Sequence, residues 1–173
     1  YSIGMLVQLF ISGMNSALTP WMYSKIKKGD IRSMRKVLQL LGIVVVGIAV
    51  ALMLISPELV LIFGSPKYRE AVYVIPPVAA SVFFIFIYNI LSMPQFYYEK
   101  TQFLMAASMA AAGANVVLNF IFIRLFGYIA AGYTTLACYM LYSVGHYIVS
   151  KRILVNEGIQ ENLMNPGFLL ACS

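Results

Sequence analysis

Charged side chains are scarce in this sequence of 173 residues. Only 10% of the residues are Asp, Glu, Lys or Arg, whereas 61% are hydrophobic. Soluble globular chains are about 25% charged and about 45–50% apolar. So few charges cannot cover a surface that faces water, and so much apolar surface excludes a disordered chain. The composition therefore indicates a protein surrounded by hydrocarbon, with the lipid bilayer as its first expected partner.

Carboxylates, histidine and cysteine are too few or too scattered for the usual catalytic and metal centres. The carboxylates all fall at or beyond the ends of apolar runs: Asp30, Glu58, Glu70, Glu99, Glu157 and Glu161. The single His146 stands shortly before Lys151, so we expect an interfacial side chain, with pH sensing as the alternative. Cys138 and Cys172 are expected to be apolar filler. We predict no enzyme activity, no catalytic or metal-binding residues and no cofactor.

Long runs without a charged residue divide the chain. A helix rises about 1.5 Å per residue, so about 20 residues cross a hydrocarbon core about 30 Å thick. We predict an all-α fold, a single polytopic transmembrane helix bundle. Its expected spans cover about residues 3–23, 37–57, 74–96, 102–123 and 128–150, with a partial span at 163–173. Because the chain begins at Tyr1 and its last run is short, we expect an internal fragment of a longer protein.

Basic residues concentrate in one short loop after the first run. This loop contains Lys25, Lys27, Lys28, Arg32, Arg35 and Lys36. Lysine and arginine favour cytoplasmic loops. Placing this loop inside also puts most of the remaining basic residues inside, whereas the reverse orientation would invert the bias. We therefore assign the net charge of +6 to membrane topology, and we expect no nucleic-acid partner.

Proline, glycine and alanine predict local features of the helices. Pro57 is expected to end the second span, leaving residues 59–63 as a separate segment at the outer surface. Pro76 and Pro77 are expected to trim the start of the third span. The stretch 124–127 predicts a tight hairpin that makes the fourth and fifth spans antiparallel neighbours. The small residues at 106–114 predict close helix packing.

Neutral polar residues form stripes on three predicted helices. The stripes are Gln8, Ser12, Asn15, Ser16 and Thr19; Ser81, Tyr88, Ser92 and Gln95, with Asn89 beside them; and Thr101, Ser108, Asn115 and Asn119. An amide facing lipid is unsatisfied at a cost of several kcal/mol, so the stripes should face protein or water. Two interpretations remain open: hydrogen bonds between helices, or the wall of a hydrated cavity that contacts a hydroxyl-rich cargo. The cavity candidates are Gln8, Ser12, Asn15, Asn89, Gln95, Asn115 and Asn119.

Three motifs occur in order over roughly residues 15–150. They are TPWMY at 19–23 with KGD at 28–30, then PEL, FG and KY between 57 and 68, then Asn115 and Asn119 followed by LFG at 125–127. Thr134 and Thr135 occupy the place of an Ala-Thr pair. In order and spacing these motifs resemble the polysaccharide (O-antigen or capsule-repeat) flippases of the multidrug/oligosaccharidyl-lipid/polysaccharide exporter superfamily. Departures from that pattern are Ala130, where glycine is frequent, and the segment 95–98.

The resemblance implies that this chain forms part of the second lobe of a two-lobed exporter. The N-terminal half of the same transporter is then an expected partner. The implied activity is the flipping of an oligosaccharide on undecaprenyl diphosphate across the cytoplasmic (inner) membrane of a bacterium or archaeon, for surface polysaccharide such as lipopolysaccharide. Lys100, Arg124 and Arg152 are candidates for attracting the diphosphate, or they are anchors at the membrane boundary.

Other functions remain open at this point. A cation-coupled multidrug exporter has the same fold. An integral-membrane glycan polymerase or transferase is less favoured, because it needs a large external loop with an acid, a base or a cation. A structural scaffold for a glycan-assembly complex is a further alternative.

Overall fold

The computed structural model describes residues 2–63, 72–164 and 167. They form five α-helices, with no β-strand in these ranges. The helices are α1 (Ser2–Lys27), α2 (Ile31–Phe63), α3 (Ile75–Tyr97), α4 (Thr101–Phe126) and α5 (Ala130–Asn156). The protein is therefore an all-α transmembrane bundle, which confirms the predicted fold class.

Every helix is long enough to cross a membrane. The shortest, α3, has 23 residues and so extends about 35 Å, more than a hydrocarbon core of about 30 Å. The described residues contain three helices that also have the apolar composition of a span: α2 over Ile31–Glu58, α3 and α4. For α1 and α5, which carry more polar and small residues, crossing stays a prediction.

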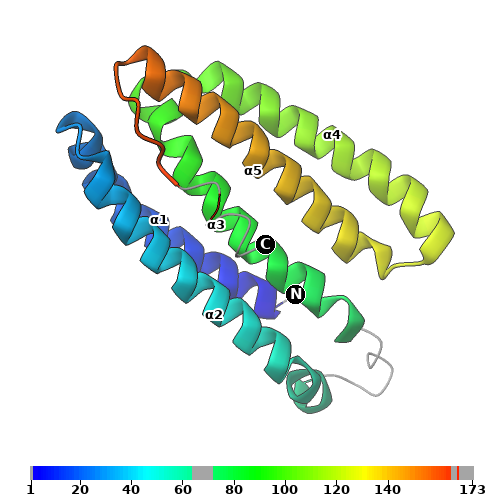
Figure 1. Cartoon of the computed structure of the whole chain (residues 1–173). Helices are drawn as coiled ribbons and strands as arrows, with labels where there is room; N and C mark the ends of the chain where they lie inside the picture. Colours follow the sequence, from blue (N-terminus) through cyan, green and yellow to red (C-terminus); the bar gives the residue numbers. More distant parts are fainter. Residues whose placement is uncertain (1, 64–71, 165–166, 168–173) are drawn as a thin grey trace.

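The central helix of the bundle is α3 (Figure 1). The α1–α2 pair lies on one side of it and the α4–α5 pair on the other. The largest hydrophobic cluster joins α3 to the first pair and includes the fully buried side chains of Met22, Ile31, Leu38 and Phe86. The helix α3 contacts all four other helices. One of its faces therefore packs against the α1–α2 pair and the other against the α4–α5 pair.

Residues 59–63 do not form the separate segment that we predicted, although the stretch of α2 that qualifies as a membrane span does end beside Pro57, at Glu58. The helix α2 runs through Pro57 to Phe63. Proline removes one backbone N–H and so leaves the carbonyl oxygen four residues earlier, on Met53, without its usual donor. The Ser56 hydroxyl donates to that oxygen at 2.8 Å. A neighbouring side chain therefore replaces the lost bond, as happens where prolines are tolerated within membranes.

Other boundaries follow the sequence more closely. Pro76 and Pro77 lie in the first turn of α3, as predicted. The turn between α4 and α5 uses Gly127 at φ 75°, and the two helices are antiparallel neighbours, as expected. The basic loop is shorter than predicted, because Arg35 and the basic residues beside it already belong to the first turns of α2.

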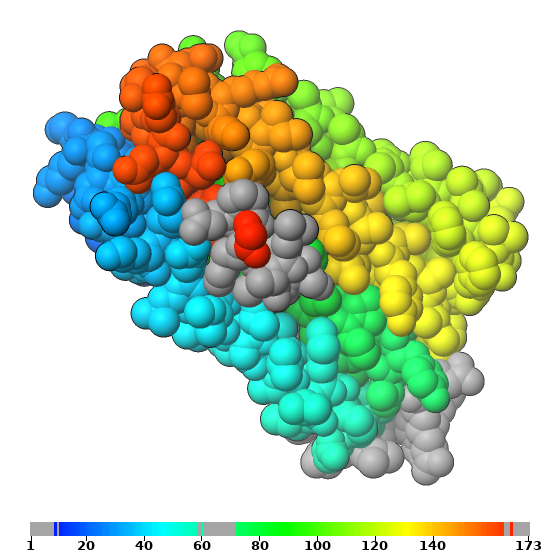
Figure 2. Space-filling model, in the orientation of Figure 1, coloured from blue at the N-terminus to red at the C-terminus, as the bar shows by residue number. Residues whose placement is uncertain are grey.

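The segment that follows α5 returns to the start of α2. The Arg35 Nε donates to the Asn162 carbonyl oxygen at 2.7 Å, and its Nη2 lies 3.3 Å from the Glu161 carboxylate. Leu163 and Met164 are buried in the main core. Figure 2 shows this segment, in orange to red, against the blue and cyan residues around the α1–α2 turn. Of the predicted partial span 163–173, all but residues 163, 164 and 167 lie outside the described residues.

Gly132 lies where the start of α5 meets the start of α3. A Cβ added there would lie 3.0 Å from Pro77 Cγ and 3.1 Å from Val74 Cγ1. Gly145, farther along the same helix, has no atom within 4 Å of the same position. The two glycines lie on the same helix but differ in packing: Gly132 is closely packed, whereas Gly145 has room for a side chain.

We expect Gly132→Ala to be less stable than Gly145→Ala by about 1–3 kcal/mol, because overpacking costs that much while both substitutions gain equally in helix propensity. The comparison is made by thermal unfolding of the purified protein in detergent. Equal midpoints for the two variants would show that α5 does not approach α3 closely at this position.

Asp30 caps the start of α2. Its Oδ1 accepts a hydrogen bond from the Ser33 backbone N–H at 3.2 Å, and its Oδ2 lies 2.5 Å from Lys25 Nζ. These bonds, the one to Lys25 foremost, lower the pKa of Asp30 from 3.8 to about 2. The helix cap and the ion pair thus fix the α1–α2 turn.

The lowered pKa of Asp30 sets how its contribution to stability depends on pH. Its stabilising contribution is complete above about pH 4 and is lost as the pH falls toward 2. We expect Lys25→Met to raise the pKa of Asp30 toward 3.8, whereas Lys27→Met, at the neighbouring basic residue, leaves it unchanged. Carboxylate titration followed by infrared spectroscopy measures both. A midpoint near the ordinary value in the unmodified protein would contradict the ion pair.

Candidate functional site

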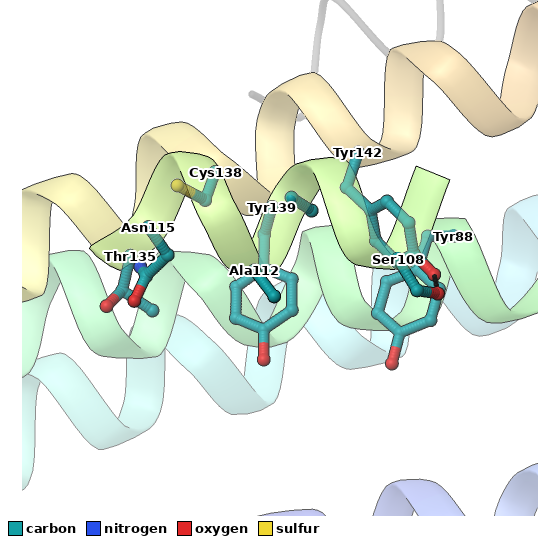
Figure 3. A pocket seen from close by; sticks show the side chains of 9 residues that line it. Tyr88, Ser108, Ala112, Asn115, Thr135, Cys138, Tyr139 and Tyr142 are labelled. Carbon is teal, nitrogen blue, oxygen red and sulfur yellow. Dashed lines mark hydrogen bonds between the residues drawn. The ribbon is translucent and has the colours of Figure 1, made fainter. Parts of the chain in front are cut away.

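A pocket of about 370 Å³ lies between α3, α4 and α5 (Figure 3). We call it the tyrosine pocket. It is lined by Tyr88, Ser108, Ala111, Ala112, Asn115, Thr135, Cys138, Tyr139 and Tyr142. These residues lie within α3, α4 and α5 rather than in the turns between them, and none of them is charged. The tyrosine pocket is therefore a polar but neutral site within the bundle.

Three tyrosine rings form one wall of the tyrosine pocket. Tyr88 and Tyr139 are nearly parallel, with 6.0 Å between ring centroids, and Tyr142 tilts against Tyr88 at 4.8 Å. Figure 3 shows the hydroxyls of Tyr88 and Tyr139 pointing the same way. Each ring offers an apolar face and a polar tip, so this wall can contact a ligand through both kinds of group.

The opposite wall comes from the alanine-rich part of α4. We predicted that residues 106–114 would pack closely against another helix. Among the described residues of α4 none is buried, and Ala111 and Ala112 line the tyrosine pocket. The helix α4 does pack against α5, and at these two positions the small side chains also leave a space facing the tyrosines.

Hydrogen bonds join α4 to α5 at both ends of the tyrosine pocket. At one end the Ser108 hydroxyl and the Tyr142 hydroxyl lie 2.5 Å apart. At the other, Asn119 Nδ2 donates to Asn115 Oδ1 at 2.9 Å, and the Thr134 hydroxyl donates to Asn119 Oδ1 at 2.5 Å. The polar stripe of α4 thus faces α5. Asn115 lines the pocket, while Asn119 lies outside the lining and holds the Asn115 side chain by a hydrogen bond.

A buried pair, Gln95 and His146, lies behind the tyrosine wall. Gln95 is 0% exposed and His146 1%, and Gln95 Nε2 lies 2.7 Å from His146 Nδ1. The His146 ring meets Tyr142 edge to face, with 4.4 Å between centroids. The His146 ring is therefore enclosed by α3 and by the tyrosines, and its partner Gln95 lies in the last turn of α3. The depth of His146 near the inner membrane surface stays a prediction.

Among the side chains that the structure describes, the remaining polar candidates do not line the tyrosine pocket. The Asn89 amide bonds the Ile85 carbonyl within its own helix at 2.8 Å. On α1, Ser12 is exposed and Asn15 is half-buried. Gln8 stands on α1, but its side chain lies outside the described part of the structure. Within the described residues, the three stripes therefore do not converge on one pocket.

The three candidate cations are exposed and lie at helix ends. Lys100 precedes α4, and Arg152 lies in the last turns of α5. Arg124 lies at the opposite end of the bundle, with its guanidinium 3.8 Å from the Phe120 ring centroid. None of them lines the tyrosine pocket.

Sequence reasoning missed Tyr139, Tyr142 and Cys138 as site residues. Their spacing carried a signal, because Thr135, Cys138, Tyr139 and Tyr142 follow the i, i+3, i+4, i+7 pattern of one helix face. Tyrosines near a membrane are usually read as interfacial anchors. The stripe on α5 was therefore indistinguishable from ordinary packing until its partners on α3 and α4 were known.

Residues 1–121 match the model of the MatE family. The chain belongs to the MatE family. Members of this family, within the exporter superfamily named above, are membrane transporters rather than enzymes. The MatE match covers α1–α3 and most of α4, so it includes Tyr88, Ser108 and Asn115 of the tyrosine pocket. No curated protein and no solved structure matches the chain.

Membership of the MatE family indicates a multi-pass membrane exporter. The tyrosine pocket adds what such a site can do chemically. It can hold an uncharged group through hydroxyls, an amide and ring faces, without a metal or a charged side chain in its lining.

Proposed function

We propose that this MatE protein is a flippase for lipid-linked oligosaccharide. It would act in the cytoplasmic membrane of a bacterium or archaeon, together with a further helix bundle of the same transporter. The observation that carries the proposal is the tyrosine pocket, whose lining is rich in hydroxyls and free of charge. The motif resemblance to polysaccharide flippases supports it.

A sugar cannot cross hydrocarbon unaided. Each hydroxyl that loses water without gaining a partner costs about 1–3 kcal/mol. Phenol, hydroxyl and amide groups within α3, α4 and α5 would replace those lost partners inside the bundle. The lipid tail of the cargo meanwhile stays in the bilayer.

The diphosphate of the carrier needs positive charge at both membrane boundaries. Lys100 and Arg152 are exposed at one end of the bundle, and Arg124 is exposed at the other. Charge-assisted hydrogen bonds from these side chains would attract the diphosphate before and after crossing. In this proposal the cations receive the headgroup, while the tyrosine pocket receives sugar.

A multidrug exporter is the second candidate. The faces of Tyr88, Tyr139 and Tyr142 favour it, because aromatic faces attract flat organic cations. The pocket lining contains no carboxylate to neutralise such a cation, so we rank this candidate below the flippase.

Deletion of the complete gene separates the two candidates. A flippase deletion is expected to abolish surface polysaccharide and to leave lipid-linked repeat units on the cytoplasmic side of the membrane. The complete gene supplied in trans should restore both. Normal surface glycan together with new sensitivity to cationic drugs would reject the flippase and support the multidrug exporter.

A further inference from the structure

We propose that the tyrosine pocket binds an uncharged sugar unit of the cargo and rejects sugars that carry a carboxylate or an amine. This inference rests on the proposed flippase function and adds the chemical class of the sugar and the place where it binds.

The first support is the absence of charge around the pocket. Its nine lining residues are all neutral, and no carboxylate is buried anywhere in the described residues. The candidate cations Lys100, Arg124 and Arg152 are exposed at the helix ends. A charged sugar in this pocket would be removed from water without a counter-charge, which is strongly unfavourable at membrane depth.

The second support is the set of polar groups that remain available. Asn115 Oδ1 accepts from Asn119, but within the described structure the Asn115 Nδ2 has no partner. The hydroxyls of Thr135 and Tyr139 likewise make no hydrogen bond to a described residue. An amide N–H donates, and a hydroxyl both donates and accepts. Sugar hydroxyls, which also do both, match this set better than an ion does.

The third support is the size and shape of the pocket. About 370 Å³ is near the lower end of the usual range for ligand sites, about 300–1,000 Å³. This space suits one or two sugar rings rather than a whole repeat unit. The faces of Tyr88 and Tyr139 provide apolar surface for the C–H face of a ring, while the tyrosine tips reach its hydroxyls.

Cys138 provides a reporter, because its buried thiol lines the pocket. The experiment uses the complete transporter in lipid vesicles, with Cys138 as its only cysteine. The thiol is alkylated with N-ethylmaleimide in the presence of prenyl diphosphates carrying one sugar. The sugars are N-acetylglucosamine (neutral), glucuronic acid (negative) and glucosamine (positive). The same vesicles are assayed for translocation of each compound.

We expect the neutral compound to slow alkylation at least about tenfold more than either charged one, since an unpaired charge costs more than the 1.4 kcal/mol that a factor of ten represents. The matched control is Cys138→Ser with Ala110→Cys, which places the thiol on an exposed part of α4 outside the pocket lining. Its alkylation should not respond to any of the sugars.

The outcomes distinguish this inference from the proposed function. Equal protection by neutral and charged sugars would overturn the selectivity. Two results would show that the cargo bypasses the pocket while the flippase proposal survives. One is translocation without protection of Cys138. The other is an unreactive Cys138 together with equal translocation rates for all three sugars. No translocation of any lipid-linked sugar, with uptake of ethidium instead, would reject the flippase proposal itself.

Discussion

Ala112→Leu is expected to reduce glycan export at least about tenfold while the protein folds normally. Ala112 lines the tyrosine pocket and is itself exposed, so a larger side chain meets the space that the sugar would occupy rather than a packed core. Overfilling a site costs about 1–3 kcal/mol, and 1.4 kcal/mol corresponds to a factor of ten.

Ala110→Leu is the matched control for this prediction. Ala110 stands two positions earlier on α4, is exposed and does not line the pocket. Leucine there should leave export unchanged. Surface polysaccharide is measured in cells that lack the chromosomal gene and carry each variant, with the protein level and its elution in detergent as folding checks. Normal export by Ala112→Leu at normal protein level would show that the tyrosine pocket is not on the cargo path.

Gln95→Leu is expected to destabilise the protein by about 1–2 kcal/mol, because the buried His146 Nδ1 loses its partner. The bond joins α3 to α5 at 2.7 Å, and both side chains are excluded from solvent. Hydrogen bonds between membrane helices average only about 0.6 kcal/mol. We expect more here, because truncating one member leaves a buried polar atom rather than an exposed one.

A double-mutant cycle isolates this pair. Gln95→Leu combined with His146→Phe removes both polar groups and keeps similar volumes, so much of the stability should return. We expect a coupling energy of about 1 kcal/mol between the two positions. Unfolding of the four proteins in a graded mixture of detergents measures it. Strict additivity would show that the Gln95–His146 contact does not stabilise the bundle.

The pair also bears on export through Tyr142. The His146 ring meets the Tyr142 ring edge to face, and the Tyr142 hydroxyl reaches Ser108 on α4. A shift of His146 therefore moves one side of the tyrosine wall. The two sets of variants report on different properties, since Ala112 acts through the space in the pocket and Gln95 through the position of its wall.

The sequence predicted the helical bundle and the positions of the tight turns well. The span predicted at 74–96 corresponds to α3 at Ile75–Tyr97, and the hairpin at Gly127 joins α4 to α5. Long uncharged runs and glycine in a left-handed conformation are local properties, so a single stretch of sequence contains all the information. The sequence did not predict that α2 continues past Pro57 to Phe63, where the Ser56 hydroxyl bonds the carbonyl that proline leaves without a donor.

Of the cavity candidates whose side chains are described, only Asn115 lines the tyrosine pocket. A helical wheel gives the face on which Asn115, Asn89 or Asn15 lies, but it does not say which helix that face meets. The same limit applies to His146: the sequence placed it near Lys151 but did not show that Gln95 and Tyr142 enclose its ring.

By itself, the sequence determined that the protein is surrounded by lipid, that it is helical and that its interior is free of charge. The length of each apolar run and the placement of charges are local properties of the chain. Only the tertiary structure decided that Tyr88, Ser108 and Tyr142 share one pocket. These residues come from three helices, and the distances between helices depend on side-chain packing, which no stretch of sequence contains on its own.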